Sequence, residues 1–110
     1  YELSMELLSQ RELPDAVYTC NNMTSLGFLK AVNEMGLTIG EDIAIMGNDR
    51  IETLDILGIP FSCVYRDNYE MGRMALRLLQ ERVEHPEKAR SIRMVPYQVK
   101  LKGSEKRKKK

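Results

Sequence analysis

A chain of 110 residues is long enough for one domain with a modest core, because single domains commonly contain about 100 to 200 residues. Apolar residues make up 43% of the chain and charged residues 30%, as in ordinary soluble globular proteins. No stretch approaches the roughly 18 apolar residues that a membrane-spanning helix needs, so we expect no transmembrane role.

The net charge of +1 conceals two regions of opposite sign. Residues 100–110 contain seven basic side chains and one acidic side chain, whereas the other 99 residues carry ten basic and fifteen acidic ones. The acidic part offers no basic face for a phosphate backbone. A terminal basic run can add non-specific affinity for anionic surfaces, but it is more often a disordered end. We therefore predict one domain over residues 1–103 and a disordered basic tail over residues 104–110.

The potentially reactive side chains form no recognisable catalytic or metal-binding pattern. Cys20 and Cys63 lie singly in hydrophobic runs, so we expect both to be small core residues. His85 precedes Pro86 where a helix should end, which favours an exposed position over a catalytic one. The chain also lacks a Gly-rich phosphate loop. We expect no enzyme activity, no metal site and no cofactor.

The first half of the chain predicts a strand, a helix and a second strand. A partial helical stripe over residues 3–13 leads to an apolar run over residues 16–20, which is typical of a buried strand. Apolar positions three apart predict a helix over residues 23–35, and Gly36 fits its C-terminal cap. Residues 43–46 are continuously apolar, as in a strand covered on both faces. This order predicts a right-handed βαβ unit with a parallel sheet, in the α/β class.

The second half predicts one further strand, a long helix and a last strand. Residues 51–58 are mixed in character, and residues 61–65 favour a third strand. Residues 68–85 show the clearest helical period of the chain, behind a capping pattern that starts at Asp67. Apolar residues alternate over residues 92–101, which indicates a final strand.

Each of the first three predicted strands runs directly into a polar cluster. These clusters lie at residues 21–22, 47–50 and 66–68. Because parallel strands share one carboxyl edge, and ligands of open α/β folds bind outside that edge, at least the first two clusters should face one cleft. Asn, Asp and Arg side chains suit the paired hydroxyls of a sugar, although they suit many other polar ligands as well.

The same residue types also form ordinary turns and helix caps. For Asn22, Asp67 and Asn68 we give capping at least equal weight with ligand binding. For Asn21 and Asp49 we favour a ligand-binding role. No regular helix is evident directly after Asp49, and an acidic group at a sheet edge needs a partner such as Arg50 or a ligand.

Four blocks of the sequence resemble motifs of the LacI/GalR family of bacterial transcription regulators. Residues 14–27 are similar to P-x-A-hydrophobic-x-x-x-N-D-x-x-A-x-G, and residues 37–49 to L-x-x-P-x-D-hydrophobic-x-hydrophobic-x-G-F-D. Residues 69–75 resemble Y-x-M-G-x-x-A, and residues 99–104 resemble the hydrophobic-V-x-R-G-S ending. The resemblance covers nearly the whole chain. It implies the C-terminal part of an effector domain of the type I periplasmic-binding-protein-like fold, truncated to the C-terminal subdomain plus a crossover helix.

The resemblance also implies which residues contact an effector. Positions matching Asn21 and Asp49 contact effector in this family, and the position of Arg66 lies near the pocket at the subdomain crossover. The chain departs from the pattern where Asn48 replaces an aromatic residue, Arg50 an acidic one and Arg66 a glutamine. Our candidate effector-binding residues are therefore Asn21, Asp49, Arg50 and Arg66. Two guanidinium groups near the cleft suggest an anionic sugar as one hypothesis.

Family dimers pair through the C-terminal subdomain, and Leu26, Leu54 and Leu57 occupy the corresponding places. Core packing is about equally plausible for Leu26, whereas a turn-rich setting favours an interface for Leu54 and Leu57. Helix 68–85 would normally pack in a subdomain that these residues do not contain. We predict that its apolar stripe docks on a sheet face or is exchanged within a homodimer.

The functional expectation is the effector-sensing and dimerisation portion of a sugar-responsive, cytoplasmic DNA-binding regulator. The small-molecule effector would be a sugar or sugar derivative, and operator DNA would be bound only through an N-terminal headpiece outside these 110 residues. The alternative is a periplasmic or lipid-anchored sugar-binding protein of a transport system.

Overall fold

The computed structural model describes residues 1–108, which fold into two compact units. The first unit contains residues 1–65 together with the chain from Val99 onward, and the second contains residues 66–98. The elements in chain order are α1 (Glu2–Leu8), β1 (Ala16–Thr19), α2 (Asn22–Glu34), β2 (Ala44–Asn48), α3 (Glu52–Ile56), β3 (Ser62–Arg66), α4 (Asn68–Glu84) and β4 (Tyr97–Lys100).

The four strands form one sheet in the order β1-β2-β3-β4. β1 pairs with β2 in parallel, with Ala16 opposite Ala44, and β2 pairs with β3 in parallel, with Gly47 opposite Cys63. The predicted parallel βαβ unit and the α/β class are confirmed. The carboxyl ends of β1, β2 and β3 therefore share one edge of the sheet, where the sequence places its polar clusters.

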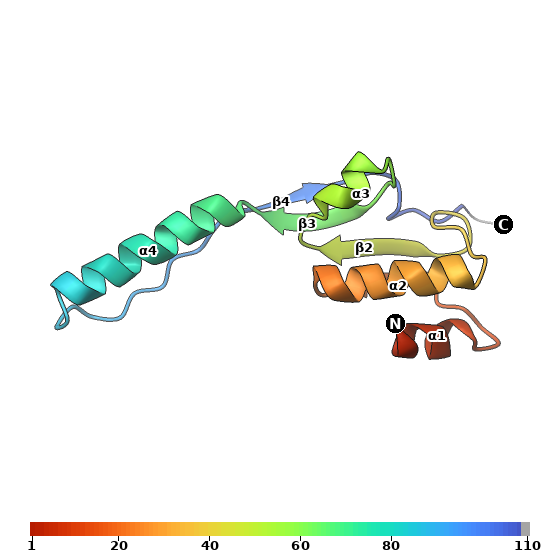
Figure 1. Cartoon of the computed structure of the whole chain (residues 1–110), viewed down its shortest axis with the longest axis horizontal. Helices are drawn as coiled ribbons and strands as arrows, with labels where there is room; N and C mark the ends of the chain where they lie inside the picture. The colour runs from red at the N-terminus through yellow and green to blue at the C-terminus, as the bar shows by residue number, and fades with distance from the viewer. Residues whose placement is uncertain (109–110) are drawn as a thin grey trace. The chain divides into compact units, whose positions relative to one another are not determined.

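Helix α2 joins β1 to β2 and packs beside the sheet (Figure 1). Phe28, Ala31 and Val32 are buried at a spacing of three and four residues, as expected for one face of a helix. Gly36 adopts a φ of 67° directly after the helix, a conformation that glycine takes at little steric cost. Helix α1 packs on the side of α2 that faces away from β2.

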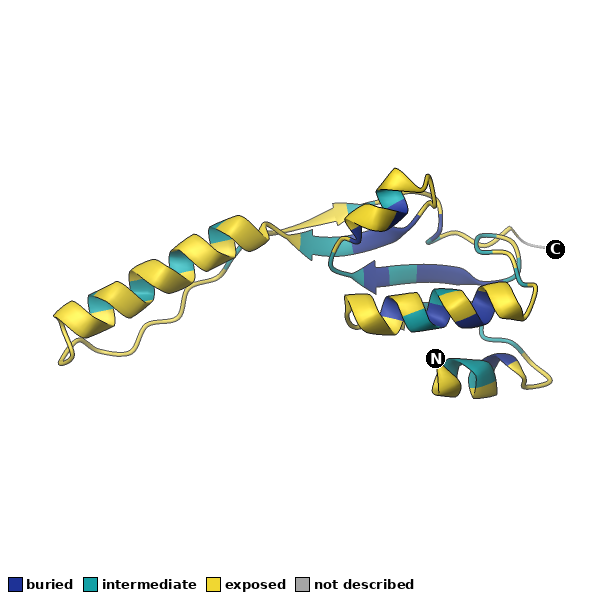
Figure 2. Cartoon of the chain, in the orientation of Figure 1, coloured by how far each residue is buried: buried dark blue, intermediate teal, exposed yellow. Residues whose placement is uncertain are grey.

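The core of the first unit lies between the sheet and its helices. Its largest fully buried apolar side chains are Phe28, Ile43, Ile45 and Cys63. Gly47 leaves space for a ring, because a Cβ atom there would lie only 2.5 Å from Cε1 of Phe61. Figure 2 shows this core as the dark blue segments of α2, β2 and β3.

Two elements are shorter than predicted. α1 ends at Leu8 rather than continuing to residue 13, and the Met5 carbonyl in its last turn accepts from both the amide and the hydroxyl of Ser9, at 3.0 and 2.7 Å. β4 contains only Tyr97–Lys100 of the predicted strand 92–101, since Ile92 and Met94 are highly exposed and gain no burial from a strand. The mixed segment 51–58 contains the short helix α3.

The expectation for the cysteines is correct at one position and wrong at the other. Cys63 is buried, and this burial raises the pKa of its thiol. Cys20 is exposed because it lies beyond the end of β1, outside the packed part of the strand. His85 is exposed at the C-terminal cap of α4, as predicted.

The described residues after Gly103 are bonded to the first unit, although residues 106–108 are exposed, and the predicted disordered tail over residues 104–110 is wrong at Ser104. Ser104 is buried, where its hydroxyl accepts a hydrogen bond from the Ser62 amide at 2.7 Å and donates to the Ile45 carbonyl at 2.9 Å. The Ser104 carbonyl in turn accepts from the Ile45 amide at 2.7 Å. These bonds fix the segment against β2 and β3. Residues 109–110 lie outside the described part of the chain.

Helix α4 belongs to the second unit and contains no buried residue. Its exposed apolar side chains include Leu76, Leu79 and Val83. Docking of this stripe on a sheet face and its exchange within a homodimer both stay predictions. The chain after α4 is held to the helix by polar contacts. One of them is the ion pair between Lys88 Nζ and Glu81 Oε2, at 3.0 Å.

Candidate functional site

The turn after β1 is shaped by the Asn21 side chain. Its Oδ1 atom accepts a hydrogen bond from the Thr24 amide at 2.9 Å, so Asn21 is the N-cap of α2. Capping at Asn22 is thus wrong by one residue, since Asn22 is the first residue of the helix. Asn21 remains exposed at the sheet edge, where a ligand can reach its amide.

The turn after β2 lies next to the turn after β1. The Asn48 amide Nδ2 donates to the Cys20 carbonyl at 3.2 Å, which joins the two strand ends. Asp49 adopts a φ of 73°, and its amide donates to the Val64 carbonyl of β3 at 2.7 Å. Its Oδ1 atom is buried. The structure therefore brings the Asn21 and Asp49 turns together at one edge, as the parallel sheet predicted.

Arg50 is directed toward α3. Its Nε atom donates to Asp55 Oδ2 at 2.8 Å. Lys102 and Lys100 also approach the Asp55 carboxylate, with Nζ to oxygen distances of 3.3 and 3.7 Å. The Arg50 hydrogen bond, with help from both lysines, lowers the pKa of Asp55, and Asp55 raises the pKa of Arg50. One carboxylate is thus shared by three cations, a cluster that sequence analysis did not identify.

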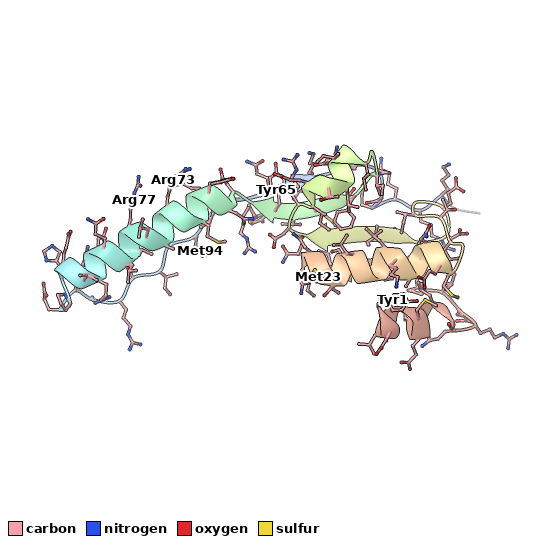
Figure 3. The ribbon with its side chains drawn as sticks, in the orientation of Figure 1. Tyr1, Met23, Tyr65, Arg73, Arg77 and Met94 are labelled. Atoms are coloured by element: carbon pink, nitrogen blue, oxygen red, sulfur yellow. The ribbon has the colours of Figure 1, made fainter. Side chains whose placement is uncertain are left out.

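Arg66 is the last residue of β3 and the first residue of the second unit, and it is exposed. Its assignment to an effector stays a prediction. The neighbouring Asp67 caps α4 by accepting from the Glu70 amide at 3.0 Å, so the capping interpretation is confirmed there. Arg73 and Arg77 project from one side of the same helix (Figure 3).

The candidate dimer residues differ sharply in exposure. Leu54 is only 5% exposed and packs in the core cluster with Ile51 and Phe61, so its assignment to an interface is wrong. The short helix α3 turns Leu54 inward and leaves Leu57, at its C-cap, 65% exposed. Leu26 is exposed on α2. Sequence analysis missed Ile56, which is exposed beside Leu57.

Residues 1–108 contain no group of three or more His, Cys, Asp or Glu side chains placed to hold a metal ion. In the same residues, no helix combines the length and the apolar character that crossing a membrane requires.

Comparison with known proteins identifies relatives over nearly the whole chain. The family model of the periplasmic binding protein-like domain matches residues 2–104. The HTH-type transcriptional repressor PurR of Haemophilus influenzae is 36% identical over 85 residues, which are 77% of this chain and 25% of that protein. The ribose operon repressor of the same species is 35% identical over 80 residues, which are 73% of this chain and 24% of that protein.

A solved structure with a similar fold comes from the same class of protein as the sequence relatives, the transcriptional regulators. A LacI-type transcriptional regulator from Bacillus cereus subsp. cytotoxis superposes with a TM-score of 0.82 at 25% identity, over 92% of this chain and 36% of that chain. The present chain spans about a quarter of the length of the curated relatives it matches. The chain belongs to the periplasmic binding protein-like domain family and corresponds to part of a LacI/GalR-type effector domain.

Proposed function

We propose that this chain is the effector-sensing and dimerisation portion of a sugar-responsive transcription regulator that acts in the cytoplasm. The observation that carries the proposal is the juxtaposition of the Asn21 and Asp49 turns, joined by the hydrogen bond from Asn48 to Cys20. Operator binding, in this proposal, belongs to a headpiece outside these residues. The named repressors among the relatives support the regulator class.

The chemistry of this edge suits a sugar. An amide offers a donor and an acceptor, and a carboxylate accepts from paired hydroxyls. One relative is named as a ribose operon repressor, which supports a sugar for this chain as well. Because Asp55 holds Arg50, the argument for an anionic sugar depends on Arg66. A neutral sugar therefore suits the Asn21 and Asp49 pair better.

An NMR titration with D-ribose and D-ribose 5-phosphate tests the effector assignment. We expect D-ribose to shift the backbone amide signals around Asn21 and Asp49, and Asp49→Asn to abolish the shift. Asn33→Asp changes an exposed amide on α2 and serves as the control. Binding of ribose 5-phosphate alone would establish the anionic alternative. No response to either compound would contradict sugar sensing.

We also propose that the exposed apolar residues of α2 and α3 form a homodimer surface. Leu26, Ile56 and Leu57 carry this surface, since all three are exposed. Ile56 and Leu57 are consecutive exposed apolar residues at the end of α3, and neighbouring exposed apolar side chains are typical of an interface.

Sedimentation of the double variant Ile56→Asp/Leu57→Asp tests the homodimer. We expect the wild-type chain to sediment as a dimer and the variant as a monomer. Leu3→Asp is a matched control, because Leu3 on α1 is 81% exposed, close to the 83% of Ile56. A dimer that survives the double substitution, or that dissociates equally with Leu3→Asp, contradicts the proposed surface.

A further inference from the structure

The turn that carries Asn21 is held in place by two buried hydroxyl groups, those of Thr19 and Ser25. The Ser25 hydroxyl donates to the Asn21 carbonyl at 2.8 Å, and Thr19 Oγ1 lies 2.6 Å from Ser25 Oγ. Because a hydroxyl has a single hydrogen, Thr19 must donate to Ser25 while Ser25 donates to Asn21. Thr19 and Ser25 are both buried. The position of the Asn21 backbone is therefore fixed by β1 and α2.

The turn that carries Asp49 is anchored independently, on the other side. Asp49 has a φ of 73°, in the left-handed region that non-glycine residues rarely adopt. Its amide donates to the Val64 carbonyl at 2.7 Å, which holds this conformation against β3. Neither this anchor nor the hydroxyl pair sets the separation between the Asn21 and Asp49 turns.

Asn48 joins the two turns at the point where backbone pairing stops. The last paired residues of β1 and β2 are Thr19 and Gly47, so Cys20 and Asn48 are the next residues along each strand. Here the Asn48 side chain continues the connection by donating from Nδ2 to the Cys20 carbonyl at 3.2 Å. Asn48 is half-buried, and its hydrogen bond to Cys20 lies at the exposed edge of the sheet.

We propose that Asn48 is a positioning residue that sets the separation of Asn21 and Asp49 for effector recognition. The inference rests on the proposed function, because it assumes that those two residues contact the effector. The aromatic residue found at this place in the resembled motif has no side-chain amide to donate to Cys20. The chain therefore has a hydrogen bond where the motif has an aromatic side chain. In this proposal Asn48 affects effector binding by positioning Asn21 and Asp49.

The test compares Asn48→Leu with Asn33→Leu. Leucine has nearly the shape of asparagine but no donor, and Asn33 is an exposed residue of α2. For Asn48→Leu we expect the NMR amide signals of residues 20–22 to shift and the dissociation constant for D-ribose to rise about three- to tenfold. Asn33→Leu should change neither quantity. Asn48→Asp removes the same donor and provides a second variant if Asn48→Leu does not fold.

The two measurements separate this inference from the proposed function. Unchanged signals at residues 20–22 in both Asn48 variants, or an unchanged affinity for D-ribose, would overturn the positioning role. A wild-type chain that does not respond to D-ribose would refute the sugar proposal. The signals of residues 20–22 would then still decide whether Asn48 connects the two turns.

Discussion

Helices α2 and α4 begin in the same way but are buried very differently. Each has a side-chain cap, from Asn21 in α2 and from Asp67 in α4, and each carries a regular apolar stripe. Yet α2 contributes Phe28 and other residues to a buried core, whereas none of the described residues of α4 is buried (Figure 2). Local sequence therefore specifies that a helix forms, while its contribution to stability depends on a second surface.

The largest effect should distinguish a leucine of the first unit from a leucine of the second. Leu54→Ala removes a 5% exposed core side chain and should lower the free energy of unfolding by about 2–5 kcal/mol. Leu79 is 60% exposed on α4, so Leu79→Ala should change the free energy of unfolding by no more than about 0.5 kcal/mol. Urea unfolding measures both. Equal losses would show that the α4 stripe is buried in solution and would remove the contrast between the two helices.

Substitution of Ser104 should cause a smaller loss in the free energy of unfolding, which would establish that this residue belongs to the first unit. Ser104→Ala removes a buried hydroxyl that bonds both the Ser62 amide and the Ile45 carbonyl. We expect a loss of about 1–3 kcal/mol, because buried backbone groups are left without partners. Ser91→Ala, at an exposed serine of the second unit, is the control. If the Ser104 variant were as stable as the wild type, the segment from residue 104 onward would not contribute to the stability of the first unit.

The sequence predicted those features that depend on short-range patterns. Gly36 and the three-residue spacing located α2, and the shared edge of parallel strands located the Asn21 and Asp49 turns. Leu54 was misplaced because a helix of five residues is too short to show a period. Ser104 was assigned to a tail because the lysines around it dominate the composition, and composition does not report a hydrogen bond to a strand 59 residues away.

A pH effect should come from Asp55, whose pKa is lowered by the Arg50 hydrogen bond and by the two lysines. A carboxylate with a lowered pKa in the folded state stabilises the fold above its unfolded value, here 3.8, and loses this contribution as pH falls toward the folded value. Asp55→Asn should therefore flatten the stability profile below about pH 4. Glu81 of the second unit has one cation, Lys88, as its main partner, so Glu81→Gln should flatten the profile less. Equal profiles, measured by urea unfolding between pH 2 and 6 (roughly the range of carboxyl titration), would contradict the importance of the cluster.

The smallest effect should come from the ion pairs at the end of the described chain. Arg107 pairs with Asp15, and Lys108 pairs with Glu41 at 2.9 Å, but each pair includes a highly exposed partner. Surface pairs of this kind contribute about 0–1 kcal/mol and are screened by salt. Arg107→Ala/Lys108→Ala should therefore cost less than Ser104→Ala, and the cost should vanish in about 1 M NaCl, whereas the cost of Ser104→Ala should persist. If salt removed both costs equally, the segment would be held by charge, and the buried hydroxyl would no longer explain why this basic end of the chain is ordered.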